Sequence, residues 1–188
     1  MNESPPQLPA TQSEGEPHFP VIDLDADPEV PKGWMVEEHQ KGGKFAFDTT
    51  TVSVAIPKQF EGIQPRGGFV VDPTPEDVAK LFQRGSQQVS KVSVETILKE
   101  LKGMPVLNAN VFYFLRANPH LIPEDWKSKS VHFFGTIYRD KYGKRCARVI
   151  DLGGVFTWEY IDRSWAPNEY IAMKAESQHK LIAPPVSE

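Results

Sequence analysis

The sequence predicts an α+β fold: a single small domain in which an antiparallel β-meander packs with two or three short helices, between disordered tails. Three observations predict it. Apolar and polar residues alternate within residues 130–162, on either side of two turns, which predicts three strands. Residues 108–117 form an apolar helix with a marked start. Many of the 17 prolines lie near the termini of the 188-residue chain.

The predicted domain spans residues 20–173. Residues 1–19 are polar and rich in proline, so they bury too little apolar surface to offset the entropy of ordering and are predicted to be a disordered tail. Residues 174–188 are predicted to be a flexible C-terminal tail. Residues 60–92 look like an insertion with a short helix, which begins at Thr74.

A short strand is expected at 21–24, and the apolar pattern resumes at 33–36. One extended strand is expected from 44 to 56, and it ends at Pro57. A helix begins near Ser93 and ends at Gly103.

The best-marked helix begins after Asn108, an N-cap residue. Leu107 and Phe112 take the two positions of a hydrophobic staple, and Asn118-Pro119 ends the helix. Because the helix is apolar almost all round, we expect it to be largely buried.

The meander has two predicted turns, Asp140–Gly143 and a two-residue loop at Gly153-Gly154. If Leu152 faces Val155 across that loop, the register is set for the whole ribbon. The opposite pairs are then Arg148 with Glu159, Arg145 with Asp162, Val149 with Trp158, and Ala147 with Tyr160. Placing Asp140 opposite Lys144 extends the ribbon to the first strand and puts Gly135 in a row with Val149 and Trp158.

Both faces of the predicted meander are partly apolar, so both require cover. The helix at 108–117 can cover one face. The N-terminal strands, a tail or a partner chain must cover the other, which makes a protein partner or a homo-oligomer the leading expectation for an interaction.

Composition excludes several classes of function. With 25 acidic and 21 basic residues the net charge is −4, which argues against non-specific nucleic-acid binding. Cys146 is the only cysteine, so no internal disulfide and no paired-cysteine metal site is expected. No secretory signal and no apolar run of membrane-spanning length is apparent. We expect a soluble, cytoplasmic protein with no cofactor, no metal and no membrane contact.

An aromatic stripe is the first candidate binding feature. Phe156, Trp158 and Tyr160 recur at strand spacing and share one face. They could form a stacking platform for bases or sugars, but core packing is the commoner use of such a stripe.

A basic cluster on the meander is the second candidate feature. Lys141, Lys144, Arg145 and Arg148 could contact phosphates. Alternation sends Arg145 and Arg148 to opposite faces, and the register above gives each a carboxylate partner, so a salt-bridged hairpin surface is favoured.

Histidines provide the only enzymatic alternative. His39, His120 and His132, with nearby carboxylates, could form a small acid/base site if the fold brings them together. No HExxH or HxH spacing indicates a metal site. Cys146 lies in mid-strand without a nucleophile motif and is expected to be a packed thiol.

Three blocks of the sequence resemble a family of small, uncharacterised bacterial proteins. The blocks are residues 23–48, 100–127 and 132–143, and the shared stretches read GWxVEEHQKGG, VLNANV…LIPExWK and FFxGTIYRD. The resemblance implies a bacterial origin and one shared module, and it implies no activity or ligand. It draws attention to Trp34, His39 and Gln40, as either fold-specifying or functional positions.

The sequence therefore predicts a non-catalytic protein-binding module. The candidate binding residues are Trp34, His39, Gln40, Phe156, Trp158 and Tyr160, with no catalytic residues assigned. A small enzyme with a histidine and carboxylate site, and a nucleic-acid binder that uses the basic hairpin, are the alternatives.

Overall fold

The computed structural model describes residues 19–57, 69–77, 79, 93–166 and 168–175. These residues form a small α+β fold, which confirms the predicted fold class. The elements in chain order are β1 (Val21–Asp23), β2 (Met35–His39), β3 (Lys44–Ala46), β4 (Val52–Pro57), β5 (Phe69–Val71), α2 (Val94–Glu100), α3 (Ala109–Ala117), the 3₁₀ helices η1 (Pro119–Leu121) and η2 (Glu124–Ser128), β6 (Ser130–Arg139), β7 (Arg145–Asp151), β8 (Val155–Tyr160) and β9 (Glu169–Lys174).

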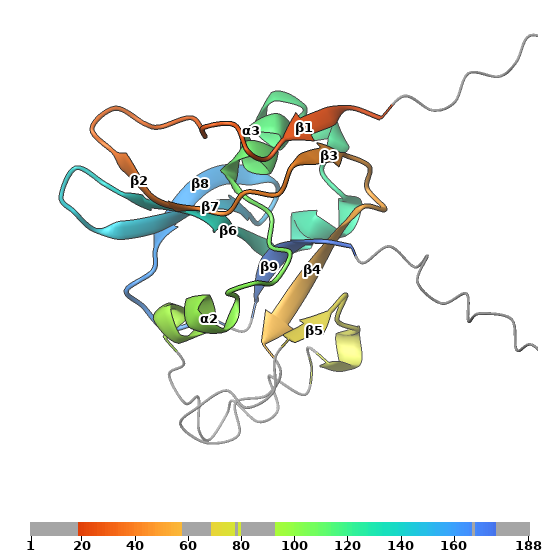
Figure 1. The fold of residues 1–188 in the computed structure, drawn as a ribbon. Coiled ribbons are helices and arrows are strands. Elements are labelled where there is room, and N and C mark those ends of the chain that lie inside the picture. The colour runs from red at the N-terminus through yellow and green to blue at the C-terminus, as the bar shows by residue number, and fades with distance from the viewer. Residues whose placement is uncertain (1–18, 58–68, 78, 80–92, 167, 176–188) are drawn as a thin grey trace, which may run out of the picture.

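The main sheet has the strand order β5-β4-β9-β6-β7-β8, and β2 pairs with the C-terminal half of β6. All of its pairings are antiparallel except that of β6 with β9, which is parallel. The predicted meander is therefore present as β6, β7 and β8. Strands β1 and β3 form a separate two-stranded sheet beside α3 (Figure 1).

Each predicted helix start that the structure describes is present. The Asn108 side chain accepts a hydrogen bond from the Asn110 N–H, and the Ser93 side chain accepts one from the Thr96 N–H. At Thr74 the hydroxyl and the Asp77 carboxylate exchange hydrogen bonds with each other's backbone N–H, which is a capping box. The remainder of that helix, like most of residues 60–92, lies outside the described residues.

Helices cover both faces of the meander. Phe133 and Phe134 are neighbours on β6, so their side chains point to opposite faces. Phe133 packs in a cluster with Phe112 of α3 and with residues of β1 and β3, whereas Phe134 packs in a second cluster with Ile97 of α2 and with Trp165. The second face is thus covered by α2 and the Trp165 segment of the same chain.

The register of β6 against β7 shifts in the middle of β6. Phe133 pairs with Arg148 and Tyr138 with Cys146, so β6 has three more residues than β7 over this stretch. The predicted row of Gly135 with Val149 and Trp158 is therefore wrong. Gly135 instead contacts the start of α3, where its N–H donates to the Leu107 carbonyl at 3.1 Å.

The loop between β7 and β8 has three residues, Leu152 to Gly154, and Asp151 pairs with Val155. The predicted two-residue loop is wrong by one position, so the predicted pairs are wrong as well: Arg148 lies opposite Trp158, Val149 opposite Thr157, Ala147 opposite Glu159 and Cys146 opposite Tyr160. A tertiary contact accompanies this register, because the Gly153 N–H donates to the carbonyl of Lys127 in η2 at 2.8 Å. The turn at Asp140–Gly143 is as predicted, with the Asp140 N–H bonded to Lys144.

Two further predictions about strands are corrected. Residues 44–56 form two strands in different sheets, because the Asp48 carboxylate accepts hydrogen bonds from the Thr50 N–H and hydroxyl and makes a turn there. Strand β9 was not predicted, although it lies between β4 and β6. It ends at Lys174, one residue beyond the predicted domain limit. Residues 1–18 and 176–188, the bulk of the predicted tails, lie outside the described residues.

Candidate functional site

Three of the six candidate binding residues lie together over one face of β7 and β8. The rings of Trp34 and Trp158 meet edge to face with centroids 5.3 Å apart, and Trp158 meets Tyr160 at 4.9 Å. Trp34 also contacts Tyr138 of β6 at 5.9 Å. We call Trp34, Trp158 and Tyr160 the aromatic wall. Trp158 remains 36% exposed, which is high for a tryptophan that contacts two other rings.

The guanidinium of Arg148 lies behind the aromatic wall. Its carbon is 5.3 Å from the Trp34 ring centroid and within 5.1–5.5 Å of three further rings, those of Phe112, Tyr113 and Tyr138. These four rings are named the Arg148 cage. Contacts of this kind attract a cation to the ring faces, and the attraction grows when water is excluded.

Arg148 has no carboxylate partner among the described residues. Within that part of the chain its guanidinium donates a hydrogen bond from Nη2 to the Tyr113 hydroxyl, and its Nε is buried without an acceptor. The residue is only 7% exposed. A buried charge without a counter-ion costs free energy that cation–π contacts offset only in part. The predicted ion pair with Glu159 is absent, because Glu159 pairs with Arg163 instead.

Lysine side chains border the aromatic wall. Lys144 lies 5.0 Å from the ring centroid of Tyr160, and Lys141 lies 4.9 Å from the ring of Tyr142, which is 73% exposed. Within the described ranges neither lysine forms an ion pair. The Tyr160 hydroxyl donates to Asp140, and this bond to a carboxylate raises the pKa of Tyr160. The surface around Arg148 is therefore cationic and aromatic.

Phe156 continues the stripe toward the core. It contacts Phe112 of α3 with ring centroids 5.3 Å apart and packs against the larger hydrophobic cluster. The stripe therefore has a packed end at Phe156 and an accessible end at Trp158.

His39 acts as a connector between segments. Its Nε2 lies 3.1 Å from the Leu24 carbonyl, which can only accept, so Nε2 carries the hydrogen. Its Nδ1 then accepts from the Thr136 hydroxyl at 2.8 Å, and that oxygen accepts the Ala109 N–H of α3. Asn108 adds hydrogen bonds to the carbonyls of Leu24 and Gln40. His39 and Asn108 thus hold the N-terminal segment on the start of α3.

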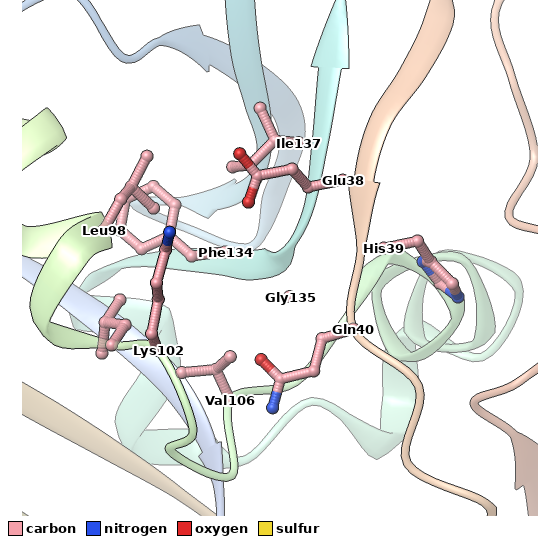
Figure 2. Close-up of a pocket in the computed structure, with 10 residues that line it drawn as sticks. Glu38, His39, Gln40, Leu98, Lys102, Val106, Phe134, Gly135 and Ile137 are labelled. Atoms are coloured by element: carbon pink, nitrogen blue, oxygen red, sulfur yellow. The ribbon is translucent and has the colours of Figure 1, made fainter.

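Gln40 borders a small pocket between β2, β6 and α2 (Figure 2). Its Nε2 donates to the Met104 carbonyl at 2.6 Å, while Lys102 and Glu38 lie at the rim. The His39 ring points away from this pocket. A volume of about 180 Å³ is below the range of 300–1,000 Å³ typical of small-molecule sites.

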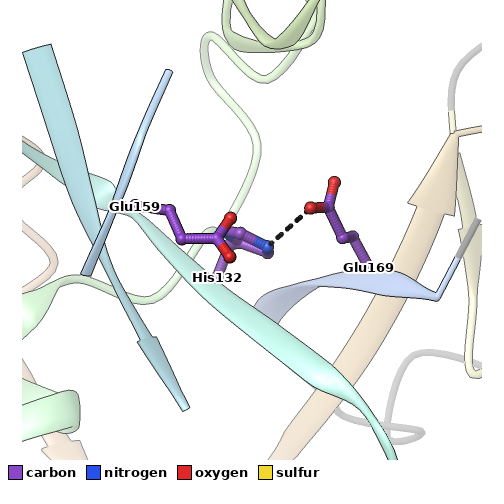
Figure 3. A group of neighbouring side chains, drawn as sticks. All are labelled: His132, Glu159 and Glu169. Carbon is purple, nitrogen blue, oxygen red and sulfur yellow. Dashed lines mark ion pairs between the residues drawn. The ribbon is translucent and has the colours of Figure 1, made fainter. Parts of the chain in front are cut away.

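The three histidines of the enzymatic alternative lie in different surroundings, and no described residue contacts more than one of them. His39 is bonded as described, His120 is exposed in η1, and His132 is buried in β6. His132 stacks on Phe134 at 5.1 Å and has Glu159 and Glu169 for neighbours (Figure 3). Burial, together with the nearby Arg163 charge, lowers the pKa of His132 to about 3, so the imidazole is neutral. No sequence motif indicates this group, because its members lie on three separated segments.

The remaining candidates have structural surroundings. Arg145 forms ion pairs with Glu37, Glu38 and Glu95, so it does not pair with Asp162 as predicted. Cys146 is fully buried against Tyr138, and burial raises the pKa of its thiol to about 12. In the part of the chain that the structure describes, no helix is long and apolar enough to cross a lipid bilayer.

No protein-family model, curated protein sequence or solved structure matches this chain. The resemblance of the three sequence blocks therefore stays a prediction.

Proposed function

We propose that the protein is a non-catalytic interaction module that binds an acidic polypeptide segment at the aromatic wall. The observation that carries the proposal is the buried guanidinium of Arg148, which lacks a carboxylate among the described residues and lies directly opposite the half-exposed Trp158. A partner carboxylate at this position would supply the missing counter-ion.

The composition of the surface favours a protein as the ligand. Tryptophan, tyrosine and arginine are the residues that most often carry the binding energy of protein interfaces. Lys141 and Lys144 add positive charge beside the wall and favour a segment with several acidic residues. Of the four basic hairpin residues, Arg145 is held in ion pairs and Arg148 is buried, which leaves Lys141 and Lys144 as accessible cations in the described ranges, so a phosphate-contacting hairpin is less well supported.

Strand β8 provides a second point of attachment. It is the last strand in the order of the main sheet, and within the described residues its outer edge is unpaired. An extended peptide can add to such an edge through its backbone and direct alternate side chains into neighbouring pockets. An acidic residue of the peptide would then reach Arg148 past Trp158. A cytoplasmic location for this interaction stays a prediction from composition.

A display library of short random peptides tests the proposal, with the purified protein as bait. Enriched peptides should combine Asp or Glu with an apolar residue, and Trp158→Ala should weaken their binding roughly 30-fold, as expected for a hot spot of about 2 kcal/mol. Arg148→Met preserves an apolar filling of the cage and should remove the preference for acidic residues. Thr157→Ala, on the opposite face of β8, is the matched control and should bind normally.

Two results would reject the proposed ligand. One is a selection without enrichment, or with peptides that bind Trp158→Ala as well as the wild type. The other is a concentration-dependent dimer in sedimentation that Trp158→Ala abolishes, since the wall would then be an interface between two copies of this chain.

A further inference from the structure

A buried imidazole nitrogen without a hydrogen-bond partner marks a second place of interest. His132 is 1% exposed and its Nε2 has no partner among the described residues. This nitrogen points toward Glu169, whose Oε1 is 3.8 Å away, beyond hydrogen-bond distance (Figure 3). A buried polar atom left in this way destabilises the fold unless something binds it.

Two carboxylates complete the group around this nitrogen. One ligand atom each from His132, Glu159 and Glu169 lies within 4.8 Å of the other two. The three residues come from β6, β8 and the first position of β9, and paired strands of one sheet fix the places of β6 and β9. Glu169 is buried and also accepts the Ala166 N–H at 2.8 Å, which orients its carboxylate.

Arg163 is the cation that this group holds in the structure. Its Nη2 pairs with Glu159 and its Nη1 with Glu169, the latter at 2.6 Å. One guanidinium charge leaves two carboxylates and a neutral imidazole with a net negative charge. The side chain of Arg163 is 28% exposed and that of Glu159 33% exposed, so this side of the group is open to solvent.

We propose that His132, Glu159 and Glu169 form a binding site for a divalent transition-metal ion, in competition with Arg163. A neutral imidazole nitrogen and two carboxylates are a donor set that suits Zn²⁺ and its neighbours. A divalent ion also balances the two carboxylate charges. Bonds of about 2.0–2.1 Å place tetrahedral ligand atoms about 3.3 Å apart, so distances between ligand atoms must shorten by up to about 1.5 Å as Arg163 turns to solvent.

Zn²⁺ titration of the full chain, followed by calorimetry and by the absorption of Co²⁺ as a spectroscopic substitute, tests this site. Arg163→Gln removes the competing cation and should tighten Zn²⁺ binding by about tenfold or more. His132→Leu in the Arg163→Gln background should weaken it by about 100-fold and abolish the visible Co²⁺ bands, because a nitrogen ligand is lost.

Matched controls separate this site from surface binding. Arg116→Gln removes an arginine that pairs with Glu29 elsewhere, and His120→Ala removes an exposed imidazole. Both should leave the Zn²⁺ affinity unchanged. Zn²⁺ binding that survives His132→Leu, or no binding to a folded Arg163→Gln protein, would show that the group is only a salt-bridged cluster.

Folding of the Arg163→Gln variant is checked first by circular dichroism, since Arg163 also donates to the Tyr160 carbonyl. If that variant does not fold, ¹⁵N resonances of the wild-type histidines decide the question at saturating Zn²⁺. A large shift of the His132 Nε2 resonance supports the site, and an unchanged resonance overturns it.

Discussion

Gly135 is a position where one added methyl group should strongly destabilise the fold. An added Cβ would lie 2.8 Å from the Leu107 carbonyl oxygen and 2.9 Å from the Asn108 Cα, both of them backbone atoms at the start of α3. Real Cβ atoms do not approach so closely, so Gly135→Ala must move β6 away from α3.

The expected cost follows from these contacts. Overpacking in a core costs about 1–3 kcal/mol. A shift of β6 also weakens two hydrogen bonds of about 1 kcal/mol each, from the Gly135 N–H to Leu107 and from the Gln40 N–H to Gly135. The alanine side chain also restricts the unfolded chain, which offsets about 0.4–1 kcal/mol of this loss in stability. We therefore expect Gly135→Ala to lower the free energy of unfolding by about 3 kcal/mol and the melting temperature by about 10 °C.

Urea denaturation followed by circular dichroism measures the change, and Gly42→Ala is the matched control. Neither glycine has a positive φ, so the two variants differ in space alone. At Gly42 the nearest atoms are the Leu24 Cδ1 and Lys174 Nζ, both 3.0 Å away at the ends of flexible side chains, and we expect a loss below about 1 kcal/mol. Equal losses for the two variants, or a loss below about 1 kcal/mol at Gly135, would refute the argument.

Three other predictions concern buried groups, each measured as the free energy of unfolding in urea. His39→Ala leaves the Thr136 hydroxyl without its acceptor and the Leu24 carbonyl with the Asn108 amide as its remaining side-chain donor, and it should cost about 1–3 kcal/mol. His120→Ala should change stability by less than about 0.5 kcal/mol, and equal costs would contradict the proposed connector role. His132 is neutral in the folded protein, but in the unfolded chain it binds a proton when the pH falls below the usual pKa of histidine. The free energy of unfolding of the wild type should therefore fall by about 1 kcal/mol between pH 6.5 and 5.5. His132→Leu should lack this pH dependence, and parallel pH profiles of the two proteins would exclude the lowered pKa. Phe112→Ala removes a ring that makes three aromatic contacts and one cation–π contact, and it should cost about 3–5 kcal/mol. A loss below about 1 kcal/mol would show that the cluster repacks.

The parts of the fold that were predictable depend on neighbours in sequence. The caps at Ser93 and Asn108 and the turn at Asp140 are each formed by side chains that bond backbone groups two to four residues away. Such signals are visible in a short window of sequence. They fixed where helices and turns occur without fixing how the strands pair.

The register and the sites depended on distant residues. The loop at Leu152–Gly154 has three residues and is hydrogen-bonded to η2, a contact that the local sequence does not indicate. The predicted register was therefore wrong by one residue, and it placed Arg148 opposite Glu159 when Trp158 lies there. Trp34 reaches Trp158 from the other end of the chain, so the aromatic wall was predicted only as separate residues. The apolar run from Tyr170 to Met173 could have indicated strand β9. A strand that is buried on both faces is continuously apolar and shows no alternation of apolar and polar residues.

The position of β9 also limits how the protein is made. Its residues leave the ribosome after every other described strand, yet it fills the space between β4 and β6. Until Glu169–Lys174 have emerged from the exit tunnel, the nascent chain has two unsatisfied sheet edges, each able to pair with other chains. Synthesis of this protein therefore includes an interval in which protection by a ribosome-associated chaperone would matter most.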